Sequence, residues 1–225
     1  MKILIIASCS ARKDDSAPIL EGSKTVQPSY YLDDESLITR LNSIRERIFQ
    51  DPRANLGSKV TYAFDLYVRA GYAYRDLREK NYHRIKSALL SSNTVEWFFL
   101  SGGYGVIHAL EVARKYQATF NRNIAYQNNI PYTANLWSNV LPSILDAIVS
   151  KFNPQWIYVF GSQDYTYFTK QTNAWKSKLN MKMFESAGSA GPFWLSSIIN
   201  ECVESVLNNR LETFNNKYPR FFKQR

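Results

Sequence analysis

Three apolar runs of strand length, each followed by small or polar residues, constrain the fold of this chain most strongly. They span residues 3–7, 95–100 and 155–160. Continuous apolar runs are typical of strands that are buried on both faces, and we expect the first run to be central in its sheet. Residues 136–152 carry apolar positions at helical spacing, so a helix lies between the second and third strands. This order predicts an α/β fold with a mostly parallel or mixed sheet and flanking helices.

Periodicity and turn residues predict the remaining elements. They are a helix capped by Asp33 or Asp34, helices over 62–80 and 82–90 that pair as a hairpin, a strand over 182–185, and a last helix that starts near Pro192. The tail over residues 217–225 is basic and aromatic. It is either a docked end or a nucleic-acid contact.

Length and charge narrow the class of protein. The chain has 225 residues, enough for one well-buried core, so we expect a single domain over residues 1–225. Lys and Arg number 28 against 19 Asp and Glu, which gives a formal net charge of +9, and 15% of the residues are aromatic. Positive charge with many rings suits a protein that binds phosphates and unstacked bases, although core packing also accounts for the rings.

Other classes are disfavoured by the sequence. The apolar runs are far shorter than the roughly 20 residues of a membrane helix, so we expect no membrane partner. The first strand follows Met1 and Lys2 without a secretory signal, and the two cysteines, Cys9 and Cys202, are far apart, which predicts a cytoplasmic, reduced protein. Two histidines without nearby cysteines provide no metal ligand set, and no nucleotide-binding glycine motif is present, so no cofactor is expected.

Four short motifs follow one another in a fixed order along the chain. They are Ser8-Cys9-Ser10-Ala11-Arg12-Lys13, Asp65-Leu66-Tyr67, Leu100-Ser101-Gly102-Gly103-Tyr104-Gly105 and Gly161-Ser162-Gln163-Asp164-Tyr165. The ordered set resembles the YaaA-like family, bacterial proteins of the peroxide-stress and related groups, over roughly the whole chain. The resemblance implies a YaaA-like α/β fold with a helix-hairpin-helix insertion, and DNA as the partner.

The chain departs from the family pattern at three places. Glu111 and Asp164 stand where the family has Asp and Glu, and residues 186–191 replace a basic cluster before the last helix. YaaA-like folds also look similar to a glycosylase used in bacterial defence against phages whose cytosines are hydroxymethylated and glucosylated. The resemblance therefore implies a bulky modified pyrimidine as the target base.

The turn after the first strand is the predicted anion site. Ser10, Arg12 and Lys13 follow a buried strand, so hydroxyl, cations and backbone amides can meet a phosphate there, with Lys170 as a further phosphate contact. An ordinary solvated turn is the alternative. Cys9 is either a nucleophile or, in the absence of a nearby histidine, a small buried thiol.

The other motifs predict contacts to a base extruded from the DNA stack. Small residues allow close approach, and tyrosine rings stack or donate hydrogen bonds. The predicted base-binding residues are Ser10, Tyr67, Ser101, Gly103, Tyr104, Ser162 and Tyr165. A tight turn that needs positive φ explains the glycines equally well, but it does not explain Tyr104.

Three carboxylates are candidates for catalysis. Asp164 ranks first because it follows a strand end on the predicted ligand edge of the sheet, and Glu111 and Asp65 are the alternatives. Each also has a structural explanation: an acid at a helix N-terminus, a solvated acid, and a helix-surface ion pair with Arg69 or Arg75, respectively.

These observations together predict a DNA glycosylase that flips and excises a base. Hydrolysis of the N-glycosidic bond passes through an oxocarbenium-like sugar, which a carboxylate can stabilise without a metal. Lys13 or Lys170 as the nucleophile would instead form a Schiff base and cleave the strand. The alternatives are a non-enzymatic stress protein that binds distorted or single-stranded DNA, and a nucleoside or deoxyribosyl-transfer enzyme.

Overall fold

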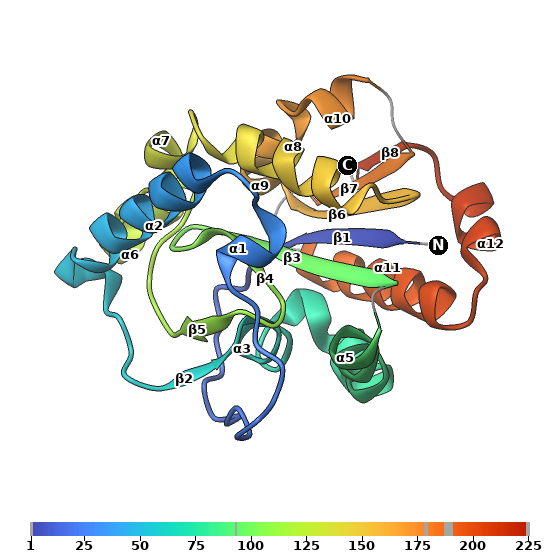
Figure 1. Cartoon of the computed structure of the whole chain (residues 1–225), viewed down its shortest axis with the longest axis horizontal. Helices are drawn as coiled ribbons and strands as arrows, with labels where there is room; N and C mark the ends of the chain where they lie inside the picture. Colours follow the sequence, from blue (N-terminus) through green and yellow to red (C-terminus); the bar gives the residue numbers. More distant parts are fainter. Residues whose placement is uncertain (1, 93, 178–179, 187–190, 224–225) are drawn as a thin grey trace.

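A six-stranded mixed sheet lies at the centre of the protein (Figure 1). The computed structural model describes residues 2–92, 94–177, 180–186 and 191–223. The strands of this sheet are β1 (Ile3–Ser8), β3 (Val95–Ser101), β4 (Gly105–His108), β6 (Trp156–Ser162), β7 (Met181–Ser186) and β8 (Phe221–Lys223). Their spatial order is β4-β3-β1-β6-β7-β8; β4 runs antiparallel to β3, and the other neighbouring pairs are parallel. The predicted α/β class with a mixed sheet is confirmed.

Strand β1 occupies the middle of the sheet, as the sequence predicts. Ile5 pairs with Trp97 of β3 on one side and with Tyr158 of β6 on the other. Residues 3–7 are almost fully buried, which explains why this strand is apolar at every position. The chain proceeds from β1 to β3 on one side and later to β6 on the other. Such a switch point favours a ligand crevice beyond the carboxyl end of β1.

Helices cover both faces of the sheet (Figure 1). One layer contains α1 (Pro28–Tyr31), α8 (Leu141–Phe152), α9 (Gln163–Lys170) and α10 (Asn173–Lys176). The opposite layer contains α3 (Ala63–Val68), α4 (Arg75–Lys80), α5 (Tyr82–Ser91) and α11 (Gly191–Leu207). More peripheral elements are α2 (Glu35–Phe49), α6 (Arg122–Asn128), α7 (Ala134–Trp137), α12 (Leu211–Lys217), the 3-10 helices η1 (Pro52–Ala54) and η2 (Tyr72–Tyr74), and a two-stranded sheet of β2 (Val60–Tyr62) with β5 (Val112–Arg114).

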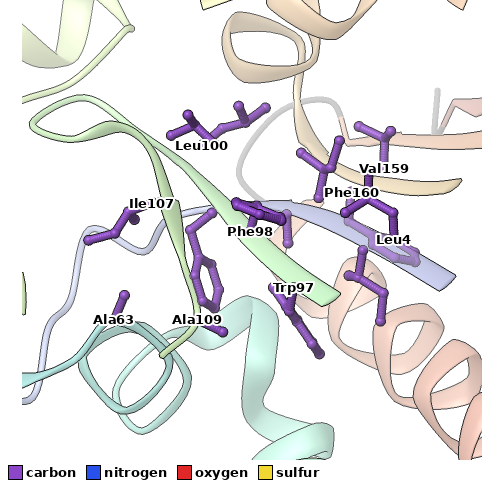
Figure 2. Close-up of a cluster of buried hydrophobic side chains, with 14 of the residues drawn as sticks. Leu4, Ala63, Trp97, Phe98, Leu100, Ile107, Ala109, Val159 and Phe160 are labelled. Atoms are coloured by element: carbon purple, nitrogen blue, oxygen red, sulfur yellow. The ribbon is translucent and has the colours of Figure 1, made fainter. Parts of the chain in front are cut away.

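Alternate side chains of β3 pack against the two helical layers. The Trp97 ring lies 5.7 Å from the Phe64 ring of α3, whereas the Phe98 ring lies 5.1 Å from the Tyr31 ring of α1. Figure 2 shows Trp97 and Phe98 among apolar side chains from neighbouring strands, including Leu4 of β1. Burial of each large apolar side chain contributes about 1.5–3 kcal/mol. The sheet is therefore a firm support for the polar loops at its carboxyl edge.

The predicted helix over residues 62–80 is wrong as a single element. Tyr62 ends β2, and the remainder divides into α3, η2 and α4. The break falls at Gly71, where a Cβ atom would lie 2.7 Å from the carbonyl oxygen of Tyr67 and 2.8 Å from Oγ of Ser10. Such close approach requires glycine, and hydrophobic periodicity does not reveal it.

Other elements match the predictions more closely. Asp34 caps α2 by accepting a hydrogen bond from the Ser36 amide at 2.8 Å, and the strand predicted over 182–185 is β7. The helix predicted over 136–152 is α7 followed by α8, because Pro142 favours the first turn of a new helix.

The C-terminal tail docks in part on the sheet. Phe221–Lys223 forms β8, which pairs in parallel with β7 at the sheet edge. Residues 224–225 lie outside the described part of the chain. Across the described ranges, no helix combines the length and the apolar character that crossing a lipid bilayer requires.

Candidate functional site

A cleft of about 1330 Å³ opens at the carboxyl edge of the main sheet. Its walls are the loop after β1, the loop over residues 117–121 and the start of α9, which follows β6. Residues of η2 and α6 line its rim. Small-molecule pockets usually measure roughly 300–1000 Å³, so this cleft accommodates a larger ligand.

The loop after β1 is anchored at both ends. The Cys9 amide donates to the carbonyl of Leu100 at 2.7 Å, and the Asp14 amide donates to the carbonyl of Leu66 at 3.0 Å. Between these anchors, no described residue accepts a hydrogen bond from the backbone N–H groups of residues 10–13. Backbone N–H groups without a protein acceptor are available to donate hydrogen bonds to an anion or to water.

Arg12 lies on the exposed side of this loop. Its guanidinium carbon is 4.4 Å from the centroid of the Tyr72 ring, and both side chains line the cleft. Tyr72 is 45% exposed, and Tyr167 on the α9 side is 54% exposed. The cleft mouth therefore presents a cation and two accessible rings, of which the sequence predicts only the cation as a contact.

Asp164 lies in the first turn of α9 and faces the cleft. Its Oδ2 atom accepts a hydrogen bond of 2.7 Å from Nδ2 of Asn121. Asn121 also caps α6, because its Oδ1 accepts from the Ile124 amide at 2.9 Å. Among the described residues, Asp164 is the sole carboxylate that lines the cleft. Its negative charge is also stabilised by the N-terminal end of the α9 dipole.

Tyr165 forms the apolar wall beside Asp164. Its ring lies 4.8 Å from that of Phe120, and its hydroxyl lies 3.4 Å from Thr119 Oγ1 and 3.8 Å from Cys9 Sγ. Burial raises the pKa of Tyr165 well above its usual value, so the phenol stays neutral and remains able to donate a hydrogen bond. Ser10 and Ser162 line the same cleft, so these three predicted base contacts lie together.

Glu111 lies outside the cleft, in a buried ion pair. Its Oε1 is 2.6 Å from Nη1 of Arg45, and its Oε2 accepts from the Tyr31 hydroxyl at 3.0 Å. Arg45 also donates to the carbonyls of Tyr104 at 3.0 Å and Val106 at 2.6 Å. Burial acts to lower the pKa of Arg45, but the charge and hydrogen bond of Glu111, together with Tyr31 and Tyr104, raise it overall, so the guanidinium stays charged. Glu111 thus ties α1 and α2 to the segment after β4, and Arg45 ties α2 to the turn between β3 and β4.

Asp65 and Lys170 also form ion pairs, and neither residue lines the cleft. Asp65 is fully buried in α3 and bonds to Lys86 Nζ at 2.7 Å and to the Tyr82 hydroxyl. Its partner is therefore Lys86, whereas the sequence suggests Arg69 or Arg75. Lys170 pairs with the buried carboxylate Glu185 of β7.

Four predicted base contacts form a buried cluster behind the loop after β1. The Tyr116 hydroxyl lies 2.5 Å from Ser101 Oγ and 3.1 Å from the Tyr67 hydroxyl, and Gly103 packs against the Tyr116 ring. Tyr104 is 7% exposed, and its hydroxyl accepts from the Arg114 amide at 2.7 Å. None of these four residues lines the cleft. The sequence does not single out Tyr116 for this hydroxyl cluster.

Gly105, which follows Tyr104, stands where the backbone conformation and the neighbouring Trp137 ring leave no room for a side chain. Its φ is +69°, and a Cβ atom there would lie 2.5 Å from the Trp137 ring. Replacement by alanine should cost about 1–2 kcal/mol for the left-handed backbone and about 1–3 kcal/mol more for displacing the ring. Gly22 provides the control, because its φ is +75° with no atom within 4 Å of a Cβ. Urea unfolding should show a clearly larger loss for Gly105→Ala than for Gly22→Ala; equal losses would exclude the packing contribution.

The structure adds residues that the sequence does not single out. Asn121, Phe120 and Tyr72 line the cleft, whereas none of the five tryptophans does. Asn121 is recognisable beforehand only as a potential helix cap, because its contact with Asp164 spans 43 residues of chain. Of residues 186–191, which depart from the family pattern, residues 187–190 lie outside the described part of the chain.

No protein-family model matches this chain, and no curated protein matches it significantly in sequence. The sheet topology defines an α/β protein with a cleft at its switch point. Its function is therefore inferred from the geometry and chemistry of that cleft.

Proposed function

We propose that this protein is a DNA glycosylase of YaaA-like fold that excises a bulky modified base, in defence against phage DNA. The observation that carries the proposal is the placement of Asp164 in a large cleft beside the cationic loop after β1 and accessible tyrosines. We further propose that α4 and α5, which Asn81 alone separates, form the helix-hairpin-helix that the family resemblance implies.

Asp164 is the proposed catalytic carboxylate. The hydrogen bond from Asn121 holds Oδ2, and no described residue bonds to Oδ1, which leaves that oxygen for a water molecule or the sugar. A carboxylate in this position stabilises the oxocarbenium-like sugar and orients the attacking water. Glu111 and Asp65 do not share this freedom, because Arg45 and Lys86 hold them inside the protein.

The surrounding residues suit an extruded nucleotide. Tyr165 is partly exposed and its ring is backed by the buried Phe120 ring at 4.8 Å, and the hydroxyls of Ser10 and Ser162 offer hydrogen bonds in the same cleft. Arg12 and the unpaired amides of residues 10–13 suit a flanking phosphate. The volume of about 1330 Å³ favours a base with a large substituent over an unmodified one.

The test is abasic-site formation on two DNAs that differ in base modification. We expect the purified protein to release bases from phage DNA that contains glucosylated hydroxymethylcytosine and to leave unmodified DNA intact. Abasic sites are counted with an aldehyde-reactive probe. Binding to each DNA is measured in parallel across a salt series, and affinity should fall steeply as salt rises because phosphate contacts release counterions.

The same experiment separates the alternatives. Salt-sensitive binding without abasic sites would contradict excision of this base and favour a DNA-binding stress protein. Turnover of free nucleosides, with an affinity that is indifferent to salt, would favour a nucleoside or deoxyribosyl-transfer enzyme.

A further inference from the structure

Lys13 occupies an unusual position in the loop after β1. It is 9% exposed, yet it lines the cleft. Its Nζ atom lies 4.3 Å from the centroid of the Tyr116 ring, and its hydrogen bond within the described residues is a long one, 3.5 Å to the Ala11 carbonyl. The amine is thus buried beside a ligand site with little to hold it there.

The described residues place no carboxylate in an ion pair with Lys13. Lys170 and Lys86 provide the contrast, because each pairs with a buried acid, Glu185 and Asp65 respectively. A lysine buried for structural reasons is normally paired in this way. Burial lowers the pKa of Lys13, the nearby Cys9 thiol opposes this effect, and the charge of Lys115 adds to it. A larger fraction of neutral, nucleophilic amine follows.

The support behind Lys13 is rigid. The Tyr116 ring on which the amine rests is fixed through its hydroxyl, which bonds to Ser101 Oγ at 2.5 Å and lies 3.1 Å from the Tyr67 hydroxyl. All three residues are fully buried. This cluster supports the lysine on the side of the Tyr116 ring, and Lys13 lines the cleft.

We propose that Lys13 is the nucleophile of an abasic-site lyase activity in the same cleft. This inference rests on the proposed function, because base excision produces the deoxyribose aldehyde that the lysine attacks. The neutral amine adds to C1′ of the ring-opened sugar, and loss of water forms an imine. A base removes a C2′ proton, the C3′–O bond breaks, and its electron pair leaves with the 3′ phosphate. Hydrolysis of the imine releases an unsaturated aldehyde and restores the amine.

Asp164 is the carboxylate available to remove the C2′ proton, because it lines the cleft with Lys13. All steps proceed without an external oxidant or reductant, since the imine itself provides the electron sink. The activity assigns different roles to two cleft residues: Lys13 bonds to the sugar, and Asp164 transfers the proton.

The experiment uses a DNA duplex with one preformed abasic site, so that its result does not depend on which base the protein excises. Borohydride reduces an imine to a stable amine, and we expect a covalent protein–DNA adduct with the wild-type protein. Mass spectrometry of the digested wild-type adduct should locate the DNA on Lys13. This mapping needs no variant and therefore does not depend on how a variant folds.

Variants give a second, independent readout. Lys13→Arg keeps the charge over the Tyr116 ring but does not form the imine, so trapping and strand cleavage should fall to the level of DNA alone. Lys176→Arg is the matched control, because Lys176 is exposed, does not line the cleft and should leave trapping unchanged. Wild-type protein that forms no adduct, or an adduct mapped elsewhere, would overturn the lyase inference. Base excision without trapping leaves the glycosylase proposal standing, and trapping at Lys13 without base excision leaves the lyase standing alone.

Discussion

Replacement of Asp164 by asparagine is expected to slow abasic-site formation by about 10²–10⁴-fold, the usual contribution of a positioned carboxyl group. Asparagine retains the shape of aspartate and an oxygen that accepts the hydrogen bond from Asn121, but it lacks the negative charge. The charge is what stabilises the oxocarbenium-like sugar. Affinity for DNA should remain close to that of the wild type, because Arg12 and the amides of the loop after β1 are untouched.

The control for this change is Asp33→Asn. Asp33 has an 80% exposed side chain paired with Lys151, and it does not line the cleft. The same loss of charge there should leave abasic-site formation unaltered. Rates are compared at saturating DNA, so that binding and chemistry are separated. An Asp164→Asn protein with wild-type turnover would remove Asp164 from the mechanism and would leave the cleft without its proposed carboxylate.

Replacement of Glu111 by glutamine is expected to lower the free energy of unfolding by about 3–5 kcal/mol, because it leaves a buried cation uncompensated. The side chains of Arg45 and Glu111 are 9% and 6% exposed, and their nitrogen and oxygen atoms are 2.6 Å apart. The loss should appear as a lower midpoint of urea unfolding with an unchanged slope. Protein that remains folded should still form abasic sites.

Glu201→Gln is the matched control for stability. Glu201 pairs with Lys217 at 2.7 Å, but these side chains are 34% and 56% exposed. Exposed pairs contribute about 0–1 kcal/mol, so the two glutamine variants should differ by several-fold in their cost. A Glu111→Gln protein that is fully stable but inactive would reverse our interpretation and make Glu111 a functional residue.

These two variants separate the candidate carboxylate that the sequence ranks first from one of its alternatives. Asp164 follows the strand β6 and Glu111 follows the strand β4, so both are acids close to a strand end. Their difference comes from their partners. Arg45, which neutralises Glu111, is 66 positions away in the chain, and Asn121, which orients Asp164, is 43 positions away.

The local sequence was sufficient to predict the three central strands and several helix starts. Residues 3–7, 95–100 and 155–160 are apolar at nearly every position, because strands in the middle of a parallel sheet meet helices on both faces. Asp34 and Pro142 marked helix starts through hydrogen-bonding and backbone restrictions that act within one turn. The break at Gly71 was missed, since hydrophobic periodicity does not report the close contacts of this position with Tyr67 and Tyr74 nearby and with Ser10, 61 residues away.

The sequence by itself determined the strand ends and the polar residues that follow them, because both depend on neighbours along the chain. It predicted that Ser10, Tyr104, Asp164 and Tyr165 share one edge of the sheet; Ser10, Asp164 and Tyr165 do line one cleft there, whereas Tyr104 does not. Folding decided which side chains remain free at that edge. Inside the protein, the Tyr104 hydroxyl accepts a hydrogen bond from the Arg114 amide, and Asp65 forms an ion pair with Lys86. Asp164 and Lys13 instead line the cleft. Whether a polar group is paired depends on residues distant in sequence, which approach only when the sheet and its two helical layers assemble.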